Sequence, residues 1–314
     1  MASRRVRELV CLRVGELASE RMRGWPKAGL NLICGLLLLV GCTAVSLTNL
    51  EAPTPILVAP TTEPTPTRSP GHLVTRSPGH LVTPSPPPDS GWQLLRTGLE
   101  QRSITLDDGQ GQPKEKLYLL RLEPEAFQFG VAYRPRRPQS LATWQAETEA
   151  LLVVNGSYFT EEFVATGLII SDGQASGTGY GSFAGMLAVT AAGPQLRWLQ
   201  ERPYDPAEPL QHALQSFPVL VKPGGQVGFP EEDGIRSRRT VVGQDRDGRI
   251  LFILAPWGSF TLHQLSNFLV GSDLNLEIAL NLDGGTSTGL LLADPAQEIP
   301  AFVPLPAVIT VHER

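Results

Sequence analysis

Residues 279–292 read ALNLDGGTSTGLLL, an apolar strand pattern that breaks at Asp283 and becomes apolar again after three hydroxyl residues. The glycines at positions 284 and 285 allow positive φ angles and a close approach of the backbone to a ligand. Successive N–H groups behind the acid can therefore form an anion-binding nest. The same residues also fit a tight Asp-Gly hairpin whose hydroxyls only cap the turn. This stretch alone leaves both interpretations open.

Two other chemistries are known for glycine-rich breaks of this kind. A phosphate loop requires a Lys before its Ser or Thr, and no basic residue follows Gly285 within ten positions. A nucleophile elbow fits better, because residues 285–289 match G-x-S-x-G with Ser287 as the nucleophile. The elbow requires a helix next, whereas LLLADP at 290–295 reads as another strand. A serine hydrolase using Ser287 therefore stays a minor alternative.

A second strand ends in a similar way at LLVVNGSYFT, residues 151–160. Asn155 can be a turn former, but beside a sugar its amide can bind hydroxyls while the aromatic ring of Tyr158 stacks on the sugar. A third segment, RSRRTVVG, carries Arg236, Arg238 and Arg239 into a strand. Such arginines form either a solvated strand edge or a guanidinium site for phosphate oxygens.

The side chains available for chemistry are few in kind. All three cysteines lie at or before position 42, and no histidine cluster is present, so a thiolate metal site is excluded beyond that point. Carboxylate, amide, hydroxyl and guanidinium groups remain, and this set suits a phosphorylated sugar. We expect no cofactor, although a hydroxyl-rich loop near Asp283 can also bind a hard cation such as Ca²⁺.

Strand patterns outnumber helical ones and do not alternate strictly with them, which predicts an α+β (mixed α/β) fold. The expected core is a twisted, mainly antiparallel or mixed β-sheet with a few flanking helices. Two half-exposed strands are expected at 116–122 and 127–133. More buried strands are expected at 151–154, 167–170, 186–190, 250–255, 277–282 and 307–311. One helix is expected after Thr261, a plausible N-cap residue, and another near Ser140, with Leu141 and Trp144.

Three regions follow from composition. Residues 1–42 combine basic residues with the apolar run LNLICGLLLLV at 30–40, as in an export signal. The run ends in LVGC and resembles a lipobox, which would make Cys42 the lipidated residue; an ordinary signal peptide or a short buried helix are the alternatives. Residues 43–90 form a Pro/Thr/Ser-rich linker with the octapeptide RSPGHLVT in tandem. Residues 91–314 form the folded domain.

The charge balance and the export signal indicate where the protein acts and what it binds. The formal net charge is −5, and it becomes about −9 once the seven basic and three acidic residues of 1–42 are removed. This balance argues against nucleic acid as a partner. We expect an extracytoplasmic protein that is lipid-anchored to a bacterial membrane, or alternatively secreted.

Four stretches in order resemble the phosphodiester glycosidase family. They are VVNGSYF (153–159), SFPVLV (216–221), RRTVVGQDRDGRILFIL (238–254) and ALNLDGGTSTGL (279–290). The final VPLPAVITV (303–311) is similar to the closing strand of the family. The sequence departs from the family pattern at Ser157, Ser216 and Thr286, where glycine or another small residue is frequent.

The resemblance implies hydrolysis of a glycosyl phosphodiester, and the export signal leads us to expect this reaction in the bacterial cell envelope. Asn155 and Tyr158 would hold the sugar, Arg239 the phosphate, and Asp283 would be the acid nearest the anomeric carbon. Further substrate contacts are expected from the remaining residues of the glycine-rich motif, namely Asn281, Gly284, Gly285, Thr286 and Ser287. The competing interpretation is a non-catalytic lipoprotein that binds envelope glycans in the same pocket.

Overall fold

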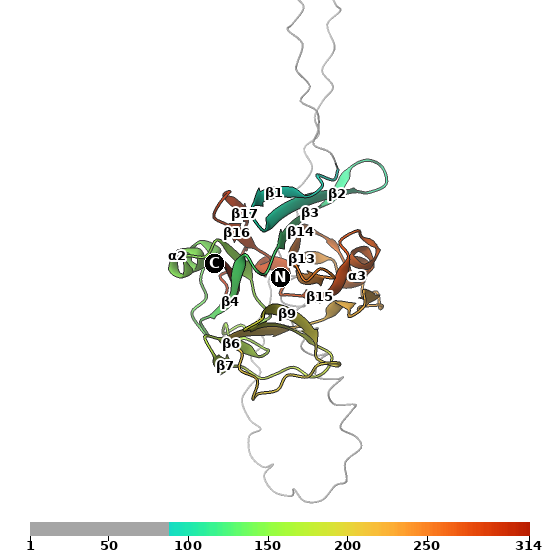
Figure 1. Ribbon diagram of the computed structural model, residues 1–314. Coiled ribbons are helices and arrows are strands. Elements are labelled where there is room, and N and C mark those ends of the chain that lie inside the picture. The colour runs from blue at the N-terminus through green and yellow to red at the C-terminus, as the bar shows by residue number, and fades with distance from the viewer. Residues whose placement is uncertain (1–87) are drawn as a thin grey trace, which may run out of the picture. The chain divides into compact units, whose positions relative to one another are not determined.

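The computed structural model describes residues 88–314, which all belong to one compact unit. This part of the chain is built from three antiparallel sheets and two short α-helices (Figure 1). None of its helices has the length and apolar character needed to cross a membrane. The Cys42 lipidation site and the linker at 43–90, apart from its last three residues, lie outside the described residues.

The large sheet has eight strands and forms one wall of the domain. Its order is β1 (Gln93–Arg96), β2 (Leu99–Asp107), β3 (Pro113–Leu122), β14 (Ile250–Phe260), β13 (Ser237–Asp245), β15 (Leu276–Asn281), β11 (Val219–Lys222) and β12 (Gln226–Val227). The central strands β14, β13 and β15 are buried along most of their length.

Two five-stranded sheets complete the domain. The β5 sheet has the order β17 (Gln297–Ile299), β16 (Leu290–Leu292), β5 (Leu152–Asn155), β18 (Ala307–Glu313) and β4 (Phe127–Tyr133). The β8 sheet has the order β7 (Gln174–Ser176), β6 (Ile169–Ser171), β10 (His212–Ser216), β8 (Gly185–Thr190) and β9 (Gly193–Trp198). The β8 sheet lies below the other elements in the view of Figure 1.

The α+β fold with a mainly antiparallel sheet core is confirmed. Every strand pairing between named strands of residues 88–314 is antiparallel. Each of the eight expected strands overlaps an observed one, and the strand expected after Gly289 is β16. The expectation of half exposure at 116–122 is wrong for part of β3, since Leu119 and Leu120 are both fully buried. Both faces of the large sheet are covered there.

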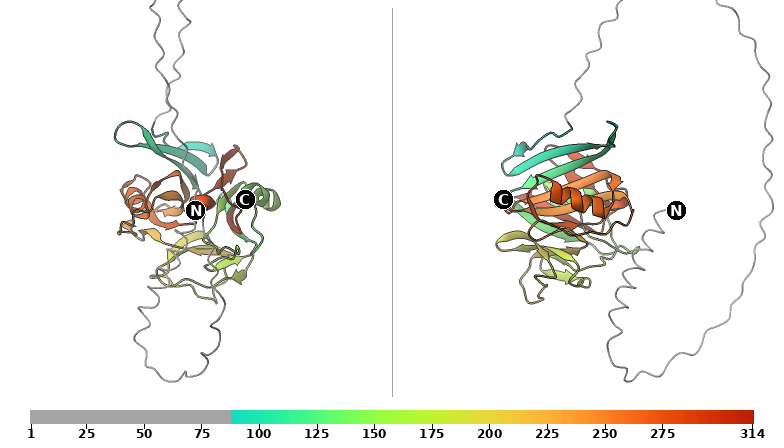
Figure 2. Two further views of the ribbon diagram at one scale, coloured as in Figure 1. Left: turned by 180° about the vertical axis from the view of Figure 1, so that it is seen from behind. Right: turned by 90° about the vertical axis from the view of Figure 1, so that its right-hand side faces the viewer.

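Both expected helices form, and their caps explain where they begin. α2 (Leu141–Thr148) begins after Ser140, whose side chain accepts a hydrogen bond from the N–H of Thr143. α3 (Leu262–Gly271) begins after Thr261 in a full capping box with Gln264. α2 and α3 lie on opposite sides of the domain, as Figure 1 shows and as the view from behind in Figure 2 also shows. α3 buries Leu265 and Leu269 against one face of the large sheet.

The main hydrophobic core lies where the three sheets meet. It combines residues such as Phe252 and Leu280 of the large sheet, Val154 and Ile309 of the β5 sheet, and Leu214 of the β8 sheet, all of them almost fully buried. Aliphatic burial on this scale is the dominant favourable term in folding. It also fixes the three sheets against one another at the point where their connections carry polar residues.

The chain passes from one sheet to another at four segments of residues 88–314. Residues 123–126 lead from β3 of the large sheet to β4 of the β5 sheet. Residues 156–168 lead from β5 to the β8 sheet, residues 217–218 lead from β10 to the large sheet, and residues 282–289 lead from β15 to β16 of the β5 sheet. These last three segments are the crossings of the candidate site. The polar break after Asn281 is therefore a crossing between two sheets. It is not a hairpin turn, because β15 and β16 belong to different sheets.

Candidate active site

Asn155 ends β5 and holds two of these crossings together. Its side chain is fully buried, and its Nδ2 donates to the carbonyl oxygens of Asp283 at 2.8 Å and Gly156 at 3.2 Å. Its Oδ1 accepts from Thr240 Oγ1 at 2.8 Å and from the N–H of Gly289 at 3.0 Å. Both ends of the amide are thus bonded to protein groups. A direct contact between Asn155 and a sugar stays a prediction.

Asp283 begins the crossing after β15 and is half-buried. Its N–H donates to Gly156 O at 3.1 Å, and its Oδ1 accepts from the N–H of Gly284 at 2.9 Å. The segment Gly285–Ser287 then forms one 3₁₀ turn, closed by the N–H of Ser287 donating to Gly284 O at 3.1 Å. The first N–H of the expected nest is therefore directed at the carboxylate of Asp283.

The two glycines of the turn are required for different reasons. Gly285 has a φ of +60°, in the left-handed region that favours glycine. Gly284 has a φ of −119°, so the positive φ expected for it is wrong. A Cβ at Gly284 would instead lie 2.7 Å from the carbonyl oxygen of Arg238. Close approach of β13 explains this second glycine.

Tyr158 and Asn281 meet at the third crossing. Asn281 Nδ2 lies 2.6 Å from the Tyr158 hydroxyl, and both groups donate to Phe217 O, at 3.2 and 3.0 Å respectively. The rings of Tyr158 and Phe217 are 4.8 Å apart. All three crossings are thus joined by hydrogen bonds around Asn155, Asp283 and Asn281.

The three arginines of the 236–239 segment make different contacts. Arg239 is 8% exposed and donates to Ile235 O at 2.7 Å and to Phe260 O at 3.4 Å. Its Cδ lies 3.9 Å from the position of a Cβ on Gly284, so its stem borders the turn. Arg236 donates to Gln264 Oε1 at 3.0 Å and lies outside this group.

The electrostatics place Tyr158, Arg239 and Asp283 in one environment. Burial raises the pKa of the Tyr158 hydroxyl, the charge of Asp283 raises it further, and Arg239 opposes the shift. Burial lowers the pKa of Arg239, and Tyr158 and Asp233 partly offset that effect. An arginine still remains charged. The acid and the guanidinium therefore act on the same buried hydroxyl from two strands.

Several buried oxygens around the crossings have no hydrogen-bond partner within residues 88–314. They are Ser157 Oγ, Ser216 Oγ, Asn281 Oδ1, Ser287 Oγ and Thr288 Oγ1. Buried polar groups are normally hydrogen-bonded, so a cluster of exceptions marks a place where water or a ligand is expected. All five belong to the segments that change sheet or immediately flank them.

The geometry does not support Ser287 as a nucleophile. Its side chain is fully buried, its hydroxyl has no partner in the described part of the chain, and β16 follows it instead of a helix. Val308 of β18 pairs with Asn155, so His312 lies four residues away from the site along that strand, roughly 13 Å. The described residues bring no histidine to Ser287.

Acidic side chains are sparse around the turn. Nowhere in residues 88–314 do three or more His, Cys, Asp or Glu side chains gather in a way that could hold a metal ion. Binding of Ca²⁺ through hydroxyl and carbonyl oxygens near Asp283 stays a prediction. Its test is a titration with a chelator.

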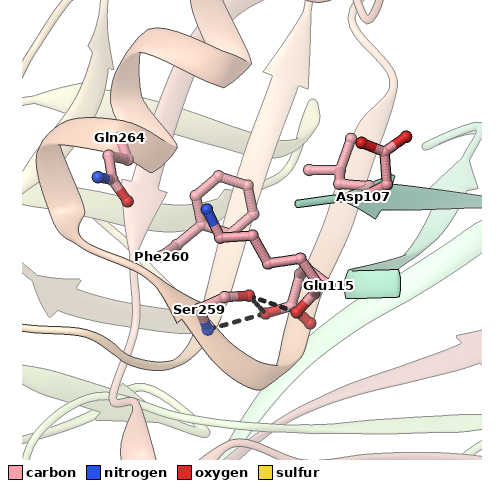
Figure 3. Close-up of a pocket in the computed structure, with 7 residues that line it drawn as sticks. Asp107, Glu115, Ser259, Phe260 and Gln264 are labelled. Carbon is pink, nitrogen blue, oxygen red and sulfur yellow. Dashed lines mark hydrogen bonds between the residues drawn. The ribbon is translucent and has the colours of Figure 1, made fainter. Parts of the chain in front are cut away.

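A separate surface pocket of about 100 Å³ lies where β3 meets the end of β14 (Figure 3). Its buried acid is Glu115, which accepts from Ser259 Oγ at 2.7 Å and from the N–H groups of Ser259 and Trp257 at 3.1 and 3.0 Å. These bonds satisfy the carboxylate and fix the irregular end of β14. The pocket contains none of the predicted site residues.

Sequence comparison identifies the family. The pattern of the phosphodiester glycosidase family matches residues 148–311, just over half of the 314-residue chain. The chain belongs to the phosphodiester glycosidase family. The match spans Asn155, Arg239 and Asp283 together. No curated protein sequence matches the chain.

Solved structures share the fold. The catalytic domain of zebrafish N-acetylglucosamine-1-phosphodiester alpha-N-acetylglucosaminidase, auto-inhibited by its pro-peptide, is 19% identical with a TM-score of 0.57. That alignment covers 69% of this chain and 84% of the zebrafish chain. A hypothetical protein from Synechocystis is 13% identical with a TM-score of 0.50, covering 69% and 62% of the two chains. At these identities the likeness concerns the fold alone.

Three residues that make contacts in the site could not be identified as site residues from the sequence. Thr240 bonds Asn155, the Phe217 carbonyl accepts from Tyr158 and Asn281, and Phe302 N–H donates to Thr286 O at 2.7 Å. Two of these contacts use backbone groups, which every residue possesses. Thr240, next to the arginines in RRTVVG, and Phe217, in SFPVLV, lay inside segments that the sequence had singled out, whereas Phe302 did not.

Proposed function

We propose that the protein hydrolyses a glycosyl phosphodiester at the Asp283 turn. The observation that carries the proposal is the convergence of Asn155, Tyr158, Asp283 and Arg239, which come from three separate segments of a chain in the phosphodiester glycosidase family. The zebrafish structure with this fold is described as acting on an N-acetylglucosamine-1-phosphodiester. That sugar is the first substrate to test here.

The proposed step breaks the bond between the anomeric carbon and the phosphate oxygen. The bonding electrons leave with the phosphate, water supplies the hydroxyl that joins the anomeric carbon, and Asp283 takes the proton of that water or stabilises the oxocarbenium-like transition state. A phosphate monoester is a good leaving group at neutral pH. One carboxylate is then sufficient, which agrees with a turn that presents a single acid.

The remaining residues have binding and positioning roles in this proposal. Arg239 and the N–H group of Gly285 neutralise the departing phosphate, because the N–H of Gly284 already donates to Asp283 Oδ1. Tyr158 and Asn281 border the sugar, and the amide of Asn155 holds the backbone of Asp283 in place. Thr286 and Ser287 supply hydroxyls to the same turn.

The test is the release of reducing sugar from methyl phosphodiesters of sugar 1-phosphates, with N-acetylglucosamine first. We expect turnover by the full-length chain and a loss of about 10³-fold or more in Asp283→Asn, because the amide can neither take a proton nor stabilise positive charge. Asp294→Asn is the matched control, since that side chain is 79% exposed. It should keep full activity.

The two outcomes separate enzyme from binding protein. Undiminished turnover in Asp283→Asn, with both variants folded, contradicts the role of Asp283. Saturable binding of the sugar phosphate by the wild type without any turnover favours the non-catalytic glycan-binding alternative.

We also propose that the protein acts in the bacterial cell envelope, attached by a lipid on Cys42. The support is the order of basic residues, apolar run and LVGC within residues 1–42. Metabolic labelling with a fatty acid should mark the wild type and fail to mark Cys42→Ala. Equal labelling of both proteins overturns the anchor and leaves the activity unaffected.

A further inference from the structure

Arg238 has nitrogen donors that no described residue uses. Its Nη2 donates to Pro300 O at 2.9 Å, whereas Nε and Nη1 are buried and have no hydrogen-bond partner among residues 88–314. Leaving a buried donor unpaired costs about 1–3 kcal/mol, and more for a charged group. Because an arginine cannot release its proton to relieve this cost, the guanidinium requires an acceptor.

The nearest opposing charge does not supply that acceptor. Burial lowers the pKa of Arg238, and the charge of Glu115 only partly offsets this effect. The carboxylate of Glu115 is already bonded to the end of β14, through Ser259 (Figure 3) and through the N–H of Trp257. An anion from outside the described chain would complete the coordination of Arg238.

The position of Arg238 links it to the proposed site. Its carbonyl oxygen is in contact with Gly284. Its guanidinium lies under the ring of Phe302, with 4.2 Å between Cζ and the ring centroid. Phe302 is in turn tied to the site through its N–H, which donates to Thr286 O. The side chain therefore lies between the Asp283 turn and the loop that carries Phe302.

The guanidinium donors of Arg238 are covered by a single exposed ring, that of Phe302. Phe302 is 64% exposed, although a large apolar side chain is normally buried. A cation under an aromatic face gains about 0.5–1 kcal/mol at an exposed site. This gain is small enough for a ligand to displace the ring. Phe302 thus shields the guanidinium when no anion is bound.

We propose that Arg238 is a second phosphate-binding residue of this site, which takes an oxygen of the leaving phosphate in addition to the contact proposed for Arg239. The inference rests on the proposed function. The diester carries one negative charge, and its cleavage leaves a monoester that approaches two at pH 7. A donor that meets the second charge stabilises the transition state and the product more than the substrate, which is the condition for catalysis.

The test compares Arg238→Gln with Arg236→Gln in the full-length chain. Arg236 belongs to the same segment but donates to Gln264, away from the turn. Inorganic phosphate is the probe, with its Kd measured by calorimetry and its Ki measured against the methyl diester. We expect Arg238→Gln to weaken phosphate binding at least 10-fold and to lower kcat/KM about 10²-fold, with Arg236→Gln unchanged.

The outcomes distinguish this inference from the proposed function. Turnover by the wild type together with unchanged phosphate binding in Arg238→Gln overturns the role of Arg238 and leaves the function standing. Absence of turnover by the wild type overturns the proposed function. The comparison of phosphate binding by the wild type and by Arg238→Gln then tests only whether Arg238 binds an anion. If Arg238→Gln does not fold, Arg238→Lys replaces it. That variant keeps the charge but lacks the planar fork, and it should bind phosphate about 3- to 10-fold more weakly.

Discussion

The two polar breaks of this protein look alike in sequence and differ in structure. The break after β5 is centred on Asn155, which is fully buried and uses both ends of its amide on protein groups. The break after β15 is half-exposed from Asp283 to Thr286, and the hydroxyls of Ser287 and Thr288 behind it have no described partner. One break holds the backbone together, and the other places a partly exposed polar turn at the junction of the sheets.

This difference indicates that the first break contributes mainly to the stability of the fold and the second mainly to the reaction. Asn155 bonds to the residues on both sides of the Asp283 turn, through Asp283 O and Gly289 N, so it fixes where the turn lies. A ligand that competed for this amide would have to break bonds that join two sheets. We therefore expect substitutions at Asn155 to act first on folding, and substitutions at Asp283 to act first on turnover.

The largest effect on stability is expected for Asn155→Ala. The variant leaves Asp283 O, Gly289 N and the Thr240 hydroxyl without their partner in a buried site. At about 1–3 kcal/mol for each such group, reduced by relaxation, the free energy of unfolding should fall by about 3–4 kcal/mol. For a domain of this size the loss lowers Tm by roughly 10 °C, which calorimetry can measure.

The control is Asn267→Ala on α3, where the amide is exposed and bonds to the carbonyl of His263 one turn earlier. It should lose less than about 0.5 kcal/mol. A similar small loss in Asn155→Ala, combined with loss of sugar binding, would show that the comparison between the two breaks is wrong and that Asn155 is a ligand residue.

Much of the fold could be predicted from sequence because the signals are local. The run FQFGVAY corresponds residue for residue to β4, and Thr261 caps α3 with Gln264 as the pattern of a capping box requires. β10 and β11 were not predicted as strands, although both overlap the SFPVLV segment that the resemblance had named.

The site could be predicted only in part, because its residues meet through topology. The acid, the amide and the arginine were identified, but no local pattern shows that β5 and β15 end at the same junction of three sheets. Phe217 contributes a carbonyl oxygen and Phe302 an N–H, and such backbone contacts do not depend on side-chain type. The burial of Asn155 could not be predicted either, because an amide at the end of a strand is equally consistent with a turn former and with a ligand-binding residue.

Substitution of either glycine in the second break should lower the stability less than Asn155→Ala does, and by different amounts at the two positions. In Gly284→Ala the new Cβ would lie 2.7 Å from Arg238 O, and β13 is paired on both sides and cannot move away easily. We expect a loss of about 1–3 kcal/mol in urea unfolding. In Gly285→Ala the new Cβ would make only an ordinary contact, at 3.4 Å from Ser237 Oγ, but the φ of +60° costs about 1–2 kcal/mol for a residue with a side chain.

Gly271→Ala at the end of α3 is the matched control for both glycines. A Cβ there has no neighbour within 4 Å, and alanine is the better helix former, so its stability should not fall. Turnover should fall in both turn variants while Gly271→Ala stays fully active. Equal tolerance at all three positions would mean that the turn has no fixed geometry to protect.

The smallest effect is expected at Tyr158, which borders both breaks. Tyr158→Phe loses the hydroxyl that donates to Phe217 O and accepts from Asn281, a cost of about 1 kcal/mol at pH 7. The pKa of this hydroxyl is raised in the folded protein, by burial first and then by Asp283, above its unfolded value of about 10. Below pH 10 both states are protonated and the wild-type stability is complete. Above pH 10 the unfolded chain loses its proton first, so the free energy of unfolding falls as pH rises.

Tyr158→Phe should therefore show a shallower loss of stability above pH 10 than the wild type, measured by urea unfolding at a series of pH values. Tyr118→Phe is the comparison, because burial also raises the pKa of that hydroxyl, which lies on β3 of the large sheet. Both variants should show a weaker dependence of the free energy of unfolding on pH above pH 10. Only Tyr158→Phe should also lower turnover, because the charges of Asp283 and Arg239 act on the Tyr158 hydroxyl. Equal turnover in the two variants would place Tyr158 with Asn155, as a residue that holds the crossings together and does not contact the substrate.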